Sequence, residues 1–231
     1  LDLGDIVGIS GKLFKTKTGE LTINTETIEL LSKSLRPLPE KFHGISDIEI
    51  KYRQRYLDLM VNPETKKLFK IRSKIISAIR NYFINDDYLE VETPMMHMIP
   101  GGAAAKPFIT HHNSLDLDLY LRIAPELFLK RCIIGGYERV FEINRSFRNE
   151  GLSIKHNPEF TMIEFYCAYE NYLYLMKLIE DLFQNLIEQL DFNSKFKYQE
   201  QEINFKTPFL KMKFYDAIEK YAMDIDMSKV N

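Results

Sequence analysis

One polar loop and the runs beside it hold side chains that could bind and position a charged ligand. Phe147-Arg148-Asn149-Glu150-Gly151 is followed by His156-Asn157-Pro158-Glu159-Phe160 and then by Glu164-Phe165-Tyr166. An arginine offers a planar charged fork to a phosphate, an aromatic ring can stack on a base, and a carboxylate can neutralise an ammonium. This inventory suits a site that holds a triphosphate, stacks a purine and neutralises an ammonium.

Strand parity groups these side chains further. If residues 159–168 form a strand, Phe160, Met162, Glu164 and Tyr166 share one face, and the largely apolar residues between them face a core. On a partner strand at 140–147, the same parity groups polar residues on one face. These are Glu142, Asn144 and, if the strand continues, Arg148 and Glu150. The pattern predicts a pocket floor made by two paired strands.

Two further segments could complete such a site. Glu126 follows Pro125 and could bind an α-amino group, although a carboxylate there could also only complement a helix dipole. Pro100-Gly101-Gly102-Ala103-Ala104-Ala105 has little side-chain bulk, so a ligand could approach its backbone closely. Each feature alone is weak evidence, because lone surface charges and glycine pairs are usually structural. His156, for example, could simply close the loop.

The elements that would position these residues predict an α+β fold. Helices are predicted from Pro63 to about Phe83, after Pro125 as far as Gly135-Gly136, over 175–187 and near 215–221. Strands are predicted at 88–92, 119–123, 140–147 and 159–168, with a short β region over 195–205. The order lacks the βαβ rhythm of a dinucleotide-binding fold, and the sequence has no GxxxxGK[ST] run for a P-loop.

The N-terminal part has a different sequence pattern. Residues 1–34 are predicted to be β, with runs at 6–14, 20–24 and 27–31, as the remainder of a small β domain. Residues 35–62 are predicted to be an interdomain linker. Within the linker, the segment Lys51–Tyr56 interleaves cations with aromatics, which fits an RNA contact or, as the favoured reading, a solvated linker helix.

Composition sets broad limits on the protein class. The chain has 231 residues, of which 45% are hydrophobic, and a formal net charge of −2, so a large core is expected and nucleic-acid binding is neither indicated nor excluded. Cys132 and Cys167 lack metal or disulfide spacing and indicate a reducing compartment. Without a membrane span or signal peptide, we expect a cytoplasmic protein, and the start at Leu1 suggests a piece of a longer one.

The motifs together resemble the lysyl-tRNA synthetases, a family of class II aminoacyl-tRNA synthetases. Residues 136–166 resemble motif 2 of that class, and residues 71–94, a helix and then a strand ending in proline, resemble the dimer-forming motif 1. Four runs resemble lysyl-tRNA synthetases specifically: 35–39, 52–59, 100–105 and 156–161. The resemblance implies three segments. They are the end of an OB-fold anticodon-binding domain (1–34), a linker (35–62) and the start of an antiparallel class II catalytic domain with flanking helices (63–231).

The resemblance also implies residue roles. Arg148 would be catalytic, contacting the α-phosphate of ATP and the carboxylate of lysine. Four further residues would bind ATP: Glu150, His156, Asn157 and Phe160, the last by stacking on adenine. Four residues would join Arg148 in binding lysine: Gly102, Glu126, Glu164 and Tyr166. The implied reaction is magnesium-dependent adenylation of lysine and its transfer to tRNA(Lys), in a homodimer.

One departure from the family limits this expectation. Motif 3 and the late carboxylates that hold magnesium do not occur before Asn231, so the chain itself is expected to hold no metal and to be incomplete as a catalyst. Three alternatives stay open: an aspartate or asparagine synthetase of the same class, a paralogue that lysylates a translation factor, and a non-catalytic truncated paralogue. Glu164 has the wrong sign to bind an aspartate side chain, and residues 1–34 count against the translation-factor paralogue.

Overall fold

The computed structural model describes residues 1–36, 38, 45, 47–151, 153 and 155–221. The chain divides into two compact units, Leu1–Ser73 and Lys74–Asn231. Helix α3 (Pro63–Asn85) contributes to both units. The predicted boundaries at residues 34 and 62 remain predictions.

The first unit begins with an antiparallel hairpin of β1 (Ile6–Lys15) and β2 (Leu21–Ser32). Its register shifts where Ser10 opposes Thr27 and Gly11 opposes Thr25, so the chain bulges at Glu26. A Cβ on Gly11 would lie 2.1 Å from the carbonyl oxygen of Asn24, which explains the glycine. The separate strands expected at 20–24 and 27–31 are therefore wrong, because they form one bulged strand.

Two short helices and the start of α3 follow the hairpin. They are α1 (Ile48–Arg53) and α2 (Arg55–Val61). The buried carboxylate of Asp58 accepts hydrogen bonds from Arg55, from Asn62 Nδ2 at 2.5 Å and from Thr65 Oγ1 at 3.1 Å. These bonds lower the pKa of Asp58, with the Asn62 contact as the largest cause. Asp58 therefore fixes the turn between α2 and α3.

Two cations of the predicted linker, Arg53 and Arg55, are engaged within the chain. The Arg55 guanidinium lies 5.0 Å from the centroid of the Tyr52 ring and 5.4 Å from that of Phe69, and Arg53 pairs with Glu49 at 3.0 Å. These contacts favour the solvated linker helix over the RNA contact. Residues 37, 39–44 and 46 of the linker lie outside the described residues.

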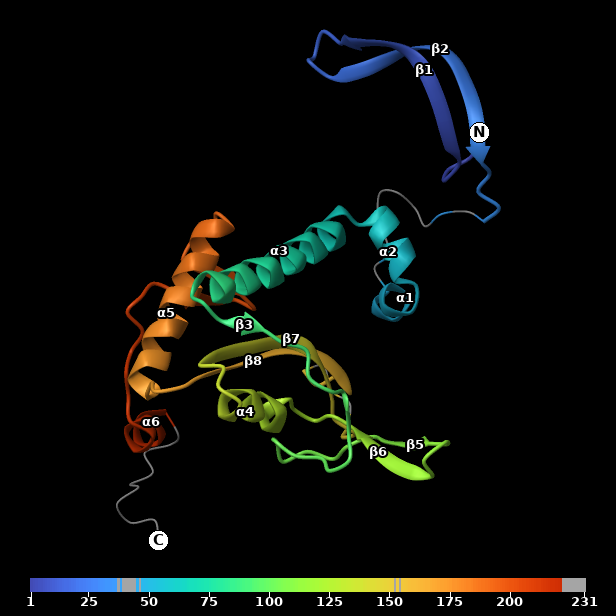
Figure 1. Ribbon diagram of the computed structural model, residues 1–231. Helices are drawn as coiled ribbons and strands as arrows, with labels where there is room; N and C mark the ends of the chain where they lie inside the picture. Colours follow the sequence, from blue (N-terminus) through green and yellow to red (C-terminus); the bar gives the residue numbers. More distant parts are fainter. Residues whose placement is uncertain (37, 39–44, 46, 152, 154, 222–231) are drawn as a thin grey trace. The chain divides into compact units, whose positions relative to one another are not determined.

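The second unit carries the candidate site (Figure 1). Its strands are β3 (Leu89–Glu90), β4 (Met96–His97), β5 (Ile109–His112), β6 (Leu117–Leu121), β7 (Arg139–Phe147), β8 (Glu159–Cys167), β9 (Lys195–Tyr198) and β10 (Gln201–Asn204). Its helices, after the end of α3, are α4 (Glu126–Ile134), α5 (Tyr172–Gln189) and α6 (Phe214–Tyr221). The sheet orders are β3-β7-β8, β4-β6-β5 and β10-β9.

The pairing of β7 with β8 fixes the two faces that parity predicted. The strands run antiparallel, with Glu142 opposite Glu164 and Ser146 opposite Phe160. The other face packs on a core that joins the end of α3 to α5. Its buried members are Phe83, Tyr88, Phe141, Leu178 and Leu182, with Ile143, Ile163, Phe165 and Cys167 partly buried against them. The apolar face of β8 is therefore the core face, as the sequence predicted.

Helix α4 packs against β7 and β8, and Figure 1 shows it on the side of this pair away from α3. It begins after Pro125, as predicted, and Gly135 caps its end. Gly136 follows with a φ of 104°, a left-handed conformation that favours glycine. Long helices and the strand pair thus agree with the predicted elements.

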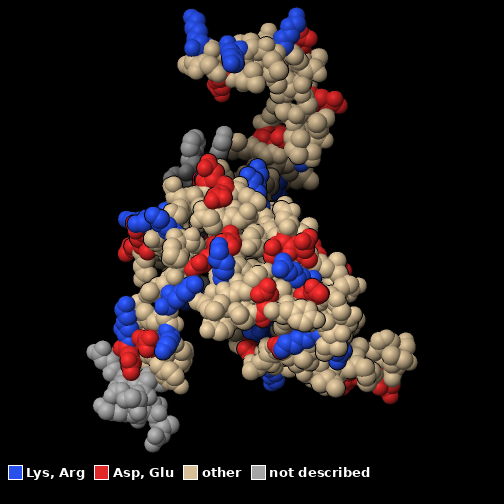
Figure 2. Space-filling view, turned by 60° about the vertical axis from the view of Figure 1, so that its left-hand side comes forward, with Lys and Arg blue, Asp and Glu red and all other residues tan. Residues whose placement is uncertain are grey.

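The model departs from the expected sheet in two ways. Only Leu89–Glu90 of the run expected at 88–92 forms a strand, and it pairs parallel to β7, so this sheet is mixed rather than wholly antiparallel. The short strands β4 and β5 were not predicted. Acidic and basic side chains are interspersed on the face in Figure 2, in keeping with the small net charge. Among the described residues, no helix is long and apolar enough to cross a membrane.

Candidate functional site

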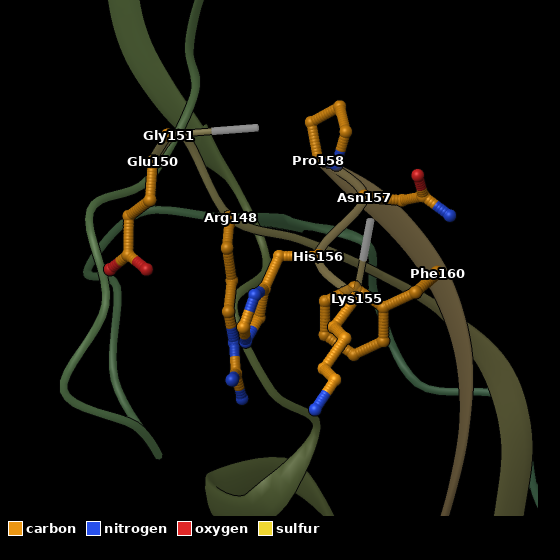
Figure 3. A pocket seen from close by; sticks show the side chains of 8 residues that line it. All are labelled: Arg148, Glu150, Gly151, Lys155, His156, Asn157, Pro158 and Phe160. Carbon is orange, nitrogen blue, oxygen red and sulfur yellow. The ribbon is translucent and has the colours of Figure 1, made fainter. Parts of the chain in front are cut away.

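A pocket opens where β7 ends and β8 begins. Its volume is about 510 Å³, within the range of small-molecule sites. Its lining residues come from the loop between the two strands and from the start of β8 (Figure 3). They are Arg148, Glu150, Gly151, Lys155, His156, Asn157, Pro158 and Phe160. The five residues predicted to bind ATP are all among them.

Arg148 lies at the centre of this pocket. Its backbone N–H donates to the carbonyl of Pro158 at 2.8 Å, which extends the β7–β8 ladder by one residue. Its guanidinium carbon lies 5.2 Å from the centroid of the Phe160 ring. The Nε atom is buried, and no hydrogen-bond acceptor lies within reach among the described residues. An unpaired buried donor is costly, so this N–H offers a bond to an anionic ligand.

The remaining loop residues are held by local bonds. Glu150 accepts from the backbone N–H of Lys106 at 3.3 Å, which ties the loop to the segment after the small-residue run. His156 Nδ1 lies 2.7 Å from Ser153 Oγ, so the histidine also closes the loop. In Figure 3 the Asn157 amide points away from Arg148, although the residue lines the pocket.

A second cluster lies further along the same face of β8. The Tyr166 hydroxyl donates to Glu164 Oε1 at 2.7 Å. Burial raises the pKa of Glu164, and the bond from Tyr166 partly opposes that shift. Burial, and then the bond to Glu164, raise the pKa of Tyr166. The pair therefore offers a half-buried carboxylate and phenol to a cation.

Helix α4 brings Glu126 to this cluster. Glu126 is the first residue of the helix, and Lys130 Nζ pairs with its Oε1 at 2.6 Å. The same ammonium lies 5.8 Å from the centroid of the Tyr166 ring. The charges of Glu126 and Lys130 both act on Glu164, the first raising and the second lowering its pKa. The predicted α-amino and ε-ammonium residues are thus neighbours.

Gly102 lies so close to Glu126 that it has no room for a side chain. Its φ is 88°, and a Cβ added to it would lie 2.9 Å from the Cβ of Glu126 and 3.2 Å from that of Ala124. Both the backbone conformation and the close approach therefore require glycine. The structure brings together Gly102, Glu126, Glu164 and Tyr166 as one cluster, and Arg148 belongs to the pocket at the other end of the strand pair.

Sequence reasoning missed a buried ion pair between Arg122, which follows β6, and Glu142 of β7. Arg122 Nη1 donates to Glu142 Oε1 at 2.6 Å, and both side chains are almost fully buried. Thr93 Oγ1 also donates to Glu142, at 2.6 Å, and Arg122 Nε donates to the carbonyl of Arg145 at 2.7 Å. The available signal was an arginine inside the apolar run 119–124, because a buried arginine needs a partner.

Two cations and a negative finding complete the inventory. Lys130 and Lys155 lie at the two clusters but were not singled out in the sequence. In the part of the chain that the structure describes, no group of three or more His, Cys, Asp and Glu side chains could hold a metal ion.

Known proteins resemble the chain over its whole length. The family model of class II tRNA synthetases (D, K and N) matches residues 47–231. A lysine–tRNA ligase of Psychrobacter cryohalolentis is 57% identical over 231 residues, 100% of this chain and 45% of the relative. Lysine–tRNA ligases of Dichelobacter nodosus and Escherichia coli are 64% and 57% identical, over 96% and 100% of the chain.

The alignments cover nearly all of this chain but less than half of each relative. The chain spans 44% of the Dichelobacter nodosus protein and 46% of the Escherichia coli protein, so it covers under half of each of these relatives. The match to the family model nevertheless includes the strand pair, the pocket and α4. The chain therefore belongs to the class II tRNA synthetase family that comprises the D, K and N enzymes.

Proposed function

We propose that this chain carries the ATP and amino-acid sites of a lysine–tRNA ligase, which activates lysine as lysyl-adenylate and transfers it to tRNA(Lys). The observation that carries the proposal is the continuity of the two clusters along one face of β8. Phe160 lies at one end and Glu164 lies four residues further on, a separation of about 13 Å along a strand. A ligand that reaches both must be elongated, with a planar ring near one end and an ammonium near the other.

The pocket at the strand ends would take ATP. Arg148 would contact the α-phosphate, and its unpaired buried Nε supports an acceptor there. Phe160 would stack on adenine, while Glu150, His156 and Asn157 would hold the base or the phosphates. Lys155 adds a second cation to the pocket lining.

The second cluster would take lysine. Glu126 would bind the α-ammonium, Glu164 and Tyr166 would bind the ε-ammonium, and Gly102 would leave room for the amino-acid backbone. Arg148 would bind the carboxylate from the other side of the reacting bond. A carboxylate beside a phenol repels the acidic side chain of aspartate, and this favours lysine over the aspartate activity of the family.

The reaction needs no protein nucleophile, because the lysine carboxylate attacks the α-phosphorus of ATP and pyrophosphate leaves. Arg148 would stabilise the charge that builds up on the α-phosphate, and the two clusters would hold the reactants in line. Magnesium would accompany ATP and neutralise its phosphates. No step here is assigned to a metal held by the described residues.

The wider setting of the site is proposed on the same basis. The hairpin of β1 and β2 would belong to an OB-fold anticodon-binding domain, residues 35–62 would link it to the catalytic domain, and residues 71–94 would form a homodimer interface. The partners would be tRNA(Lys) and L-lysine in the cytoplasm. The names of the relatives at 56–64% identity support lysine and tRNA(Lys) as the partners.

Ligand binding tests the proposal directly on the 231-residue chain. Chemical-shift titrations with lysine, aspartate and asparagine should show saturable binding of lysine alone, with shifted amides around Glu126 and Glu164. ATP should shift amides around Arg148 and Phe160. Binding of aspartate or asparagine instead of lysine would overturn the proposed substrate. ATP–pyrophosphate exchange with the same three amino acids provides the parallel readout of activation.

A further inference from the structure

The cluster proposed for lysine already contains an ammonium from the protein. Lys130 lies one helical turn after Glu126 on α4, and its Nζ pairs with the Glu126 carboxylate at 2.6 Å. The Lys130 side chain is 52% exposed and that of Glu126 is 30% exposed, so water reaches the pair. Glu126 therefore has a cation on it before any ligand arrives.

The Lys130 ammonium lies near the groups proposed to bind both ammonium groups of lysine. Besides its bond to Glu126, Lys130 Nζ lies 5.8 Å from the centroid of the Tyr166 ring. Tyr166 in turn donates to Glu164, whose carboxylate is influenced by the Lys130 charge. A single internal cation thus lies beside the groups proposed for the α-ammonium and the ε-ammonium.

We infer that Lys130 is an affinity-determining residue, an internal counter-ion that competes with the α-ammonium of the amino acid for Glu126. This inference rests on the proposed function. The ligand's ammonium takes the place of Lys130 Nζ on the carboxylate, and the Lys130 side chain moves into water, which its exposure allows. An exposed ion pair is weak, so the exchange costs the ligand only a small part of its binding energy.

The exchange also gives the site a chemical preference. The competition affects ligands that use Glu126, and so requires an α-amino group. A ligand that has the carboxylate and the ε-ammonium but lacks the α-amino group, such as 6-aminohexanoate, leaves the Lys130–Glu126 pair in place. The two ligands therefore separate a contest at Glu126 from a general change of charge.

The test compares lysine and 6-aminohexanoate binding to the wild-type chain and to Lys130→Gln by chemical-shift titration. Lys130→Gln should bind lysine about two- to fivefold more tightly, the range that an exposed pair can contribute. The gain for 6-aminohexanoate should be smaller, because that ligand responds only to the loss of the Lys130 charge near Glu164. Lys130→Arg, which keeps the charge, should resemble the wild type. In a Glu126→Gln background, Lys130→Gln should change lysine affinity no more than it changes 6-aminohexanoate affinity.

A matched control lies on α5, where Lys177 pairs with Asp181 at the same helical spacing. Lys177→Gln should leave both affinities unchanged. Unchanged or weaker lysine binding by Lys130→Gln would overturn the inference but leave the proposed function standing. Weaker binding would mean that Lys130 positions Glu126 for the ligand. An equal gain for 6-aminohexanoate would also overturn it. Absence of lysine binding by the wild-type chain would overturn the proposed function, and this inference with it.

Discussion

The guanidinium of Arg148 covers the Phe160 ring, with 5.2 Å between its central carbon and the ring centroid. The two residues come from opposite sides of the loop, one just after β7 and one near the start of β8. The contact places a fixed positive charge beside the aromatic surface proposed for adenine. In the proposed site, phosphate and base recognition would therefore be coupled, because a change to either residue alters the surroundings of the other.

Replacing Phe160 with leucine should weaken ATP binding to the chain. Stacking of an aromatic side chain on a base contributes about 1–3 kcal/mol, and leucine keeps the apolar bulk without the ring. Titration with ATP measures the loss, and lysine affinity should change little. Tyr172→Ala at the start of α5 is the control, since that residue is 70% exposed. An unchanged ATP affinity in Phe160→Leu would remove the ring from the nucleotide site.

Replacing Gly102 with alanine should abolish or strongly reduce lysine binding. The added Cβ would lie 2.9 Å from the Cβ of Glu126, so the glutamate or the loop must move. Gly19 has a similar φ of 85° with nothing within 4 Å of its added Cβ. Gly19→Ala therefore shares the backbone cost of about 1–2 kcal/mol without the clash. Similar lysine affinities in the two variants would show that the close approach is not needed.

Lysine affinity should fall as the pH is lowered through the raised pKa of Glu164. Burial raises this pKa, so the carboxyl takes up a proton at a higher pH than an ordinary glutamate, and only its ionised form pairs with an ammonium. The affinity is thus full at pH values above this raised pKa and is lost as the pH falls below it. Titrations at a series of pH values should show this fall, and Glu164→Gln should give weaker binding with a flatter profile.

Tyr166→Phe provides an internal check on that profile. The hydroxyl of Tyr166 donates to Glu164 and lowers its pKa, so removing the hydroxyl should raise the pKa further. The midpoint of the affinity loss should then move to higher pH than in the wild type. A midpoint that stays in place or moves to lower pH would contradict the assignment of the titration to Glu164.

Replacing Glu142 with glutamine should destabilise the second unit strongly. The change leaves Arg122 buried without its charged partner, and breaking a buried pair costs about 3–5 kcal/mol. Urea denaturation followed by circular dichroism measures the free energy of unfolding. The control is Glu202→Gln, which removes the exposed pair with Lys195 and should cost under about 1 kcal/mol. Equal small losses would show that the buried pair is not needed for stability.

Much of the site followed from local patterns. The alternation of Phe160, Met162, Glu164 and Tyr166 has the period of a strand, and the pairing of β7 with β8 confirmed the faces that it predicted. The long helices followed from their periodicity in the same way. Hydrophobic periodicity and the residues that end helices and strands depend on neighbours in the chain, so a single sequence reveals them.

The rest depended on contacts between distant segments. The partnership of Arg122 with Glu142 and the position of Lys130 beside Tyr166 arise from packing, which periodicity does not encode. The two-residue strands β3 and β4 are too short to show alternation. The bulge at Glu26 was read as a break, because an extra residue interrupts the pattern without ending the strand.

The β7–β8 register has a consequence for how this part of the chain tolerates changes in length. Deleting one residue early in β8 would invert every later side chain, turning Phe165 toward the pocket and Glu164 toward the aromatic core. Residues added to the connecting loop would leave both faces as they are. Insertions and deletions across evolution should therefore occur mainly between the strands, so that the loop varies in length while the lengths and the register of the strands stay constant.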